Sequence, residues 1–302
     1  MRTEWTRLYT GDGYPLLGLG HGLEQTGVAV LYVHGLGGNG FTLFTDDLSV
    51  ALPAAGYPFV RGNLRTAELL RIDEFPESAQ VHKGGGAFHT FDDSMQDIAV
   101  WMDYIESRGH RQVVLFGHSL GSLKAAHYLA HTDDARVVGL VLASTADLIA
   151  MHESRFTFKE RAEFADLAAA LVTAGRGDEL LPPECGMGLM RQPVSAASYL
   201  DRFGANPAWD VMDLYGRGST RAFAALRRVQ VPVLAMFGSE NETVPASRIG
   251  QVFEVLRAAA AQAPSFTTAV LAGANHFYTG HGEQVASVLL NWLAQQPSWR
   301  AA

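Results

Sequence analysis

Short apolar segments alternate with longer helical patterns along this 302-residue chain, and the alternation restricts the folds that it can adopt. Strands buried on both faces of a parallel sheet form nearly continuous runs rich in Val and Leu. Six such runs occur, at 28–35, 57–63, 112–119, 137–144, 231–239 and 266–273. Amphipathic helical patterns lie at 94–108, 119–131, 246–262 and 281–295. The sequence therefore predicts an α/β fold, with a doubly wound, mostly parallel sheet covered by helices on both faces.

Residues 145–218 interrupt this alternation, because no strand is expected there. Helical patterns at 158–175 and 195–203 are separated by loops rich in Gly and Pro. Since the sheet resumes at Val231, we expect a helical cap or lid over the carboxyl edge of the sheet, rather than extra helices without such a role. The predicted division is a core of residues 1–145 and 219–302 and a cap of residues 146–218.

Two further segments have a distinct pattern. Residues 3–21 alternate around a Gly- and Pro-containing turn, which is typical of a β-hairpin. Residues 66–90 show no regular pattern and contain three consecutive glycines. Irregular connections of this length are uncommon and are usually functional or disordered.

Composition argues against several classes of protein. The net charge is -8 without a long basic run, so a nucleic-acid partner is not expected. The single cysteine, Cys185, excludes an internal disulfide and a CxxC motif, and we interpret it as an ordinary free thiol. The N-terminus lacks the apolar region of a secretory signal, and no apolar run reaches the roughly 18 residues that span a bilayer. We therefore expect a cytoplasmic protein with no membrane span.

The segment Gly117-His118-Ser119-Leu120-Gly121 carries the strongest chemical signal. It follows the apolar run at 112–116 and opens a helical pattern, which is the setting of a nucleophile elbow. The flanking glycines permit a sharp turn that exposes the Ser119 hydroxyl at the edge of the sheet. We predict that Ser119 is a catalytic nucleophile.

A second glycine-rich segment, His34-Gly35-Leu36-Gly37-Gly38, follows the first parallel strand. Glycine here allows the backbone to approach a substrate oxygen closely. We predict that the N–H groups of Leu36 and Leu120 form an oxyanion hole, with Gly35 beside them. His34 is interpreted as a structural residue that braces this loop.

The third segment, residues 273–280, contains His276 after the last predicted strand and ahead of the last helix. A histidine at this edge of the sheet can accept the proton of Ser119 and return it to the leaving group. We predict that His276 is the general base. No metal or organic cofactor is required for this chemistry.

Together these segments resemble the α/β-hydrolase superfamily over nearly the whole chain. The resemblance implies the order serine, acid, histidine, which Ser119 and His276 follow. The stretch from residue 63 to residue 101, followed by a helical cap, is also similar to a branch that includes fungal siderophore-ester hydrolases.

One position departs from the family pattern G-x-x-D-x-x-V. The chain has Gly238 and Val244 at the family spacing, but Asn241 occupies the acid position. In serine proteases the equivalent Asp-to-Asn change lowers turnover by about 10⁴, roughly 5.5 kcal/mol of barrier. We predict that Asn241 orients His276, with Glu242 as the next candidate.

A carboxylate at another position could also support His276. Glu240, or Asp147 after the preceding strand, could supply this group. Alternatively, the enzyme is slow, acts on an activated ester or thioester, or no longer hydrolyses its substrate.

The leading functional hypothesis is a serine hydrolase that cleaves a carboxylic ester, thioester or lactone through an acyl-enzyme on Ser119. The apolar cap suggests a small-molecule substrate with a hydrophobic acyl group. Five aromatic residues of the cap region could line its pocket, although core packing is the expected role for any single one of them. These are Phe156, Phe158, Tyr199, Phe203 and Trp209. The alternatives are an acyl transferase, cyclase or lyase on the same scaffold, and a catalytically weak ligand-binding homologue. The sequence does not determine the oligomeric state.

Overall fold

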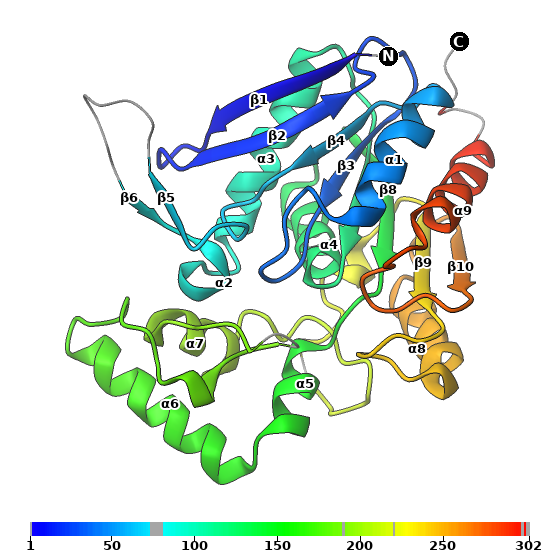
Figure 1. The fold of residues 1–302 in the computed structure, drawn as a ribbon. Helices are drawn as coiled ribbons and strands as arrows, with labels where there is room; N and C mark the ends of the chain where they lie inside the picture. The colour runs from blue at the N-terminus through cyan, green and yellow to red at the C-terminus, as the bar shows by residue number, and fades with distance from the viewer. Residues whose placement is uncertain (1, 73–80, 189–190, 220, 297–298, 300–302) are drawn as a thin grey trace.

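The computed structural model describes residues 2–72, 81–188, 191–219, 221–296 and 299. Eight strands form one mixed sheet in the order β1-β2-β4-β3-β7-β8-β9-β10 (Figure 1). Their bounds are β1 Thr3–Tyr9, β2 Pro15–His21, β3 Ala29–Val33, β4 Phe59–Gly62, β7 Val113–His118, β8 Val137–Ala143, β9 Val233–Gly238 and β10 Phe266–Leu271. β1 and β2 are the antiparallel N-terminal strands, whereas β4, β3 and β7–β10 run parallel. The predicted fold class is confirmed.

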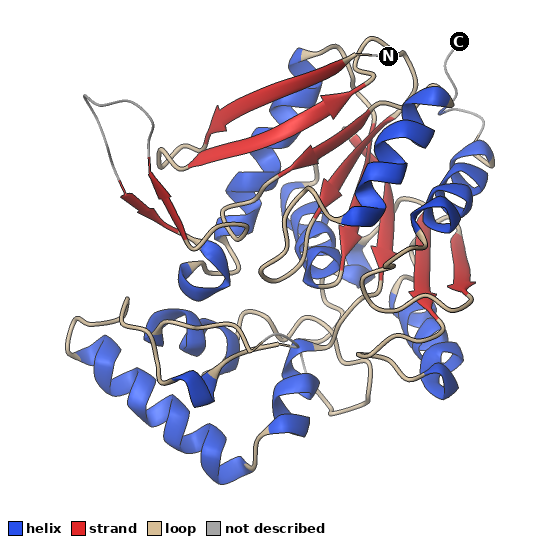
Figure 2. Cartoon of the chain, viewed as in Figure 1, coloured by secondary structure: helices blue, strands red, loops and turns tan. Residues whose placement is uncertain are grey.

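The central strands are buried on both faces, and successive residues contribute to two separate cores. Leu115 belongs to the core beneath α3 (Asp93–Ser107), α4 (Leu120–Thr132) and α8 (Ala246–Ala259). Its neighbour Phe116 belongs to the core beneath α1 (Leu43–Ala54) and α9 (Gly282–Ala294). Helices therefore cover both faces, as Figure 2 shows. This two-sided burial explains why the strand sequences are apolar without alternation.

The elements that follow β8, from α5 to α7, lie across the carboxyl ends of the parallel strands (Figure 1). They are α5 (Leu148–Arg155), α6 (Phe158–Thr173), η1 (Pro183–Cys185) and α7 (Ala196–Phe203). A last short helix before β9, η2 (Leu226–Arg228), packs instead on α4 and α8. α6 and α7 enclose a small core of their own, which includes Ala168, Cys185 and Tyr199. Thr157 and Glu160 form a capping box at the start of α6.

Two expectations are corrected. The stretch from 66 to 90, expected to be irregular, contains β5 (Leu70–Ile72) paired with β6 (Val81–Lys83), and the short helix α2 (Gly85–Phe88). Part of it, residues 73–80, lies outside the described residues. The segment also supports α7, because the Ser195 N–H donates to the Ala87 carbonyl at 2.9 Å. Helix α1 was not among the helices expected. Its residues Phe44, Leu48 and Leu52 are buried on the face that packs on α9, whereas Leu43 and Val50 are exposed.

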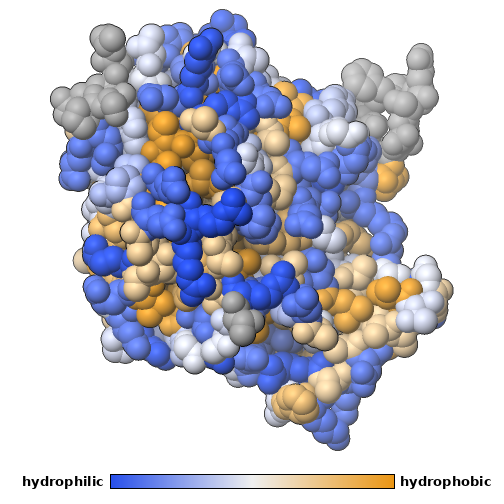
Figure 3. Space-filling model, turned by 180° about the vertical axis from the view of Figure 1, so that it is seen from behind, coloured by the Kyte–Doolittle hydropathy of each residue, from blue (hydrophilic) through white to orange (hydrophobic). Residues whose placement is uncertain are grey.

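The outer surface of α6 is partly apolar. Phe158, Leu167 and Val172 are exposed there. Figure 3 views the molecule from behind and shows hydrophobic residues in its lower part, where α5, α6 and α7 lie. In the described part of the chain, no helix is long and apolar enough to cross a membrane.

Candidate active site

Ser119 lies in a strained turn between β7 and α4. Its backbone has φ 56° and ψ -124°, a conformation that L-residues adopt rarely and at a cost in energy. Both flanking glycines are required by packing, because a Cβ on Gly117 would lie 2.5 Å from the Gly121 carbonyl and one on Gly121 would overlap the Val33 carbonyl. The turn leaves the Ser119 side chain partly exposed at the sheet edge.

The structure brings His276 to Ser119 from 157 residues farther along the chain. Nε2 of His276 lies 2.9 Å from Oγ of Ser119. Nε2 of His118 donates to the main-chain carbonyl of His276 at 2.8 Å, and so holds the histidine loop against β7. The imidazole of His276 is almost fully buried.

The other ring nitrogen of His276 faces a threonine. Nδ1 of His276 lies 3.3 Å from Oγ1 of Thr243, and Oγ1 of Thr243 donates to Oδ1 of Asn241 at 2.7 Å. The same Oδ1 accepts the main-chain N–H groups of Thr243 and Val244, which fixes the orientation of the amide. Among the described residues, no hydrogen bond joins the Asn241 side chain directly to His276, and the two side chains are linked through the Thr243 hydroxyl.

This chain of donors determines the tautomer of His276. Because an amide oxygen only accepts, the hydroxyl proton of Thr243 points to Asn241. The hydroxyl oxygen is then left to accept from Nδ1 of His276. Nε2 is consequently unprotonated and can accept the proton of Ser119. The hydrogen bond to Thr243 is long for N–H···O geometry, and neither supporting side chain carries a charge.

The candidate carboxylates occupy other positions. Oε2 of the exposed Glu242 accepts the main-chain N–H of His276 at 2.7 Å, so it contacts the backbone and not the ring. Glu240 is exposed. Asp147 is buried, caps α5 by accepting from Ala150 N–H, and pairs with Arg217 at 3.1 Å. Its carboxylate is therefore engaged in holding the chain after β8.

Burial dominates the electrostatics of the site. It lowers the pKa of His276 to about 3, with a smaller contribution from His118. Burial likewise lowers the pKa of His118 to about 4. The imidazole of His276 is thus neutral at physiological pH, which is the form that accepts a proton, but the surroundings do little to stabilise an imidazolium.

The glycine-rich loop after β3 lies directly against Ser119. A Cβ on Gly35 would lie 2.9 Å from Cβ of Ser119 and 3.3 Å from the main-chain nitrogen of Leu120. Among the described residues, the N–H groups of Leu36 and Leu120 donate to no other group. Both are therefore free to bind an oxygen at Ser119.

His34 anchors this glycine-rich loop. Its Nε2 accepts the Leu64 N–H at 2.9 Å, while Nδ1 lies 3.1 Å from the Gly35 carbonyl. Burial lowers the pKa of His34 to about 3, so the ring remains the neutral acceptor that Leu64 requires. These contacts agree with the bracing role expected for His34.

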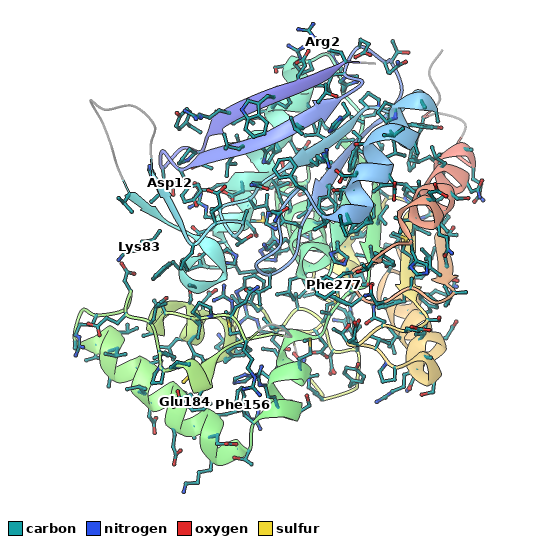
Figure 4. The ribbon with its side chains drawn as sticks, viewed as in Figure 1. Arg2, Asp12, Lys83, Phe156, Glu184 and Phe277 are labelled. Carbon is teal, nitrogen blue, oxygen red and sulfur yellow. The ribbon has the colours of Figure 1, made fainter. Side chains whose placement is uncertain are left out.

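A cavity of about 340 Å³ opens at Ser119, within the usual size range of small-molecule sites. Its walls include Leu148, Met151 and Met187 from the segment between β8 and β9, and Phe277 from the segment between β10 and α9. Figure 4 shows Phe277 above Phe156, which directly follows α5.

The five aromatic residues expected in the pocket divide into two groups. Phe156 and Phe203 line a second, neighbouring cavity. Tyr199 and Trp209 are buried in the cores, and Phe158 is 81% exposed, so these three line neither cavity. Within the described residues, no group of three or more His, Cys, Asp or Glu side chains is placed to hold a metal ion.

Two residues of the site were not anticipated from the sequence. Thr243 has a local signal, since Asn side chains commonly bind the backbone two residues on, and Asn241 does so here. Gln192 has no such signal: its Nε2 donates to the Leu36 carbonyl at 3.4 Å, which joins the segment before α7 to the glycine-rich loop. That contact depends on how the elements that follow β8 are placed over the sheet edge.

Comparison with known proteins agrees with the fold. The sequence profile of the alpha/beta hydrolase family matches residues 30–288. The chain therefore belongs to the alpha/beta hydrolase family. Comparison with curated protein sequences finds no significant match.

Three solved structures illustrate the breadth of the similarity. An esterase of Pyrococcus furiosus, PF2001, is 14% identical with a TM-score of 0.61, and the match covers 99% of this chain and 91% of the esterase. The alpha/beta hydrolase GrgF of Penicillium sp. sh18 is 13% identical with a TM-score of 0.65, covering 98% and 99%. DcsB, solved with a substrate analogue, is 15% identical with a TM-score of 0.67, covering 97% and 99%. At these identities the similarity establishes the fold alone, and it does not support the siderophore-ester branch.

Proposed function

We propose that the protein is a serine hydrolase that cleaves a carboxylic ester, thioester or lactone through an acyl-enzyme. The 2.9 Å contact between Oγ of the strained Ser119 and Nε2 of His276 is the observation that carries this proposal. Oγ of Ser119 attacks the carbonyl carbon while its proton passes to His276. The N–H groups of Leu36 and Leu120 bind the resulting oxyanion.

The tetrahedral intermediate then collapses, and the proton on His276 passes to the leaving group. A water molecule repeats the sequence on the acyl-enzyme and releases the acid. Gly35 keeps the oxyanion loop close to Ser119. Asn241 acts on His276 as a positioning residue through the Thr243 hydroxyl, and Glu242 positions the His276 backbone. We further propose that residues 146–218 form a cap over the core, and that the substrate is a small molecule with a hydrophobic acyl group.

One observation supports acyl transfer as a second candidate function. Among the described residues, no carboxylate contacts Nδ1 of His276, and the two groups that support the ring are neutral. A base supported in this way is best suited to an activated acyl donor such as a thioester. Release of the acyl group to an alcohol or amine, rather than to water, would then make the protein a transferase or cyclase.

The test combines labelling with turnover. A fluorophosphonate probe should label the wild-type protein and not Ser119→Ala. A panel of p-nitrophenyl esters of increasing chain length should be cleaved by the wild type and by the control Ser107→Ala, which alters an exposed serine at the end of α3. Full ester cleavage by Ser119→Ala would overturn the proposal.

Three further measurements separate the alternatives. Glu242→Gln retains an acceptor for the His276 N–H, so we expect a loss below threefold; abolition of turnover would assign the acid role to Glu242. Incorporation of ¹⁸O from labelled water into the released acid identifies hydrolysis. Predominant formation of a new ester in the presence of an added alcohol identifies transfer.

A further inference from the structure

A second cavity, of about 740 Å³, lies beside the Ser119 pocket on the cap side. Five residues line both cavities: Leu148, Met151, Met187, Gly188 and Thr243. The two spaces are therefore adjacent, and most of the side chains between them are apolar. A substrate with its carbonyl at Ser119 and an extended apolar portion has room to reach this second cavity.

The charge of the second cavity differs from that of the whole protein. The net charge of the chain is -8, yet four arginines and two glutamates line this cavity. The positive residues are Arg155, Arg191, Arg217 and Arg248, and the negative residues are Glu153 and Glu242. The excess of positive charge is thus a local property of the space next to the active site.

Two of these charged residues are already neutralised. Arg217 pairs with the carboxylates of Asp147 at 3.1 Å and Asp210 at 2.8 Å. Glu153 pairs with Arg161 at 2.8 Å. Neither therefore determines what the cavity attracts. The charges that remain are three arginines and Glu242, whose carboxylate accepts the His276 main-chain N–H, so the balance is still positive.

The remaining three arginines have no carboxylate within ion-pair distance in the described part of the chain. Arg155 lies on Phe156, with Cζ 5.2 Å from the ring centroid, and donates to the Gly188 carbonyl at 3.0 Å. Arg248 lies on Tyr215, with Cζ 4.8 Å from the ring centroid. Because a guanidinium has five N–H donors, most of them remain for a ligand.

Arg191 adds its positive charge close to that of Arg155. Both side chains line this cavity, and burial together with the positive charge of Arg191 lowers the pKa of Arg155. An anion between them would remove the repulsion.

We propose that this cavity binds a negatively charged group of the substrate, a carboxylate or phosphate that lies beyond an apolar segment from the reacting carbonyl. Arg155, Arg191 and Arg248 hold the anion, since guanidinium groups bind such anions with paired hydrogen bonds. The apolar segment passes Met151 and Met187. This assignment of substrate class rests on the proposed serine hydrolase function.

The experiment measures the ratio of kcat/KM for matched anionic and neutral substrates. One pair places the charge in the acyl group: p-nitrophenyl hemiesters of linear dicarboxylic acids against p-nitrophenyl alkanoates of equal length. The other places a phosphate on the leaving group: butanoyl thioesters of 4′-phosphopantetheine and of pantetheine. We expect a preference of at least tenfold, about 1.4 kcal/mol, for the anionic member of one pair. The pair that shows the preference identifies the charged end.

Variants assign the preference to the cavity. Arg191→Gln and Arg248→Gln should each reduce the ratio by about tenfold, and salt should reduce it in the wild type. Arg111→Gln is the control, because exposed Arg111 precedes β7 at the opposite edge of the sheet, and the ratio should keep its wild-type value. Ser119-dependent cleavage with a ratio near one in both pairs would overturn this inference and leave the proposed function standing. Cleavage that does not depend on Ser119 would overturn the proposed function itself.

Discussion

Substitution of Asn241 by Asp places a charge where the family pattern has one, and so tests how His276 is supported. The buried site can accept the carboxylate, because Oδ1 already receives three hydrogen bonds, from the Thr243 hydroxyl and from the main-chain N–H groups of Thr243 and Val244. The Ser144 hydroxyl, 2.9 Å from Nδ2, can rotate to donate to the second oxygen.

The expected magnitude follows from the geometry. Hydrogen bonds of 2.7 and 3.3 Å keep the new charge within about 6 Å of the His276 ring. At an effective dielectric constant of about 20, an attraction over this distance is worth about 3 kcal/mol. The pKa of His276 should rise from about 3 to roughly 5. If the full attraction acts in the transition state, kcat/KM for esters rises about 100-fold.

The direction of the predicted pKa change is checked by a pH profile of kcat/KM. His276 acts in its neutral form, so activity is lost as the pH falls through its pKa. Raising that pKa moves the acid limb of kcat/KM to higher pH and leaves the site competent at pH 7. Asn241→Asp should show both the faster turnover and the shifted acid limb. The double variant that combines Asn241→Asp with Thr243→Val should lose most of the increase in kcat/KM. An unchanged limb together with unchanged kcat/KM would refute the coupling of position 241 to His276.

Three further predictions concern other parts of the site. Thr243→Val removes the acceptor of Nδ1–H and should lower kcat about tenfold, whereas Thr243→Ser retains the hydroxyl and most of the activity; equal losses in both would indicate a packing role. Gly35→Ala places a Cβ 2.9 Å from the Cβ of Ser119, so the oxyanion loop must shift, and kcat should fall about 10²-fold in steady-state assays; unchanged kcat would argue against this oxyanion hole. Arg217→Met leaves the buried carboxylate of Asp147 without its cation and should lower the free energy of unfolding by about 3 kcal/mol in urea titrations; a loss below 1 kcal/mol would show that the main-chain hydrogen bonds suffice.

The parallel sheet could be predicted because its strands are buried on both faces, and this leaves a signal within each short segment. Helix α1 was missed, although it packs its apolar face on α9 in the same way as the helices that were expected. The strand pair β5 and β6 was missed because three-residue strands are too short to show a period.

The candidate site was predictable to the extent that each component has a local backbone requirement. The turn at Ser119 needs glycine on both sides, and the approach of Gly35 to Ser119 excludes a side chain. Such requirements are visible in a sequence because few residues satisfy them. The position of His276 followed from its place after the last parallel strand.

The sequence by itself thus determined the fold class and the candidate nucleophile, base and oxyanion loop. Only the tertiary structure decided what faces the second nitrogen of His276, because the direction of a side chain depends on the packing around it. It placed Thr243 there and Asn241 behind it. Likewise, only the tertiary structure brings the arginines at 155, 191 and 248 to one cavity, since no local pattern links residues so far apart in the chain.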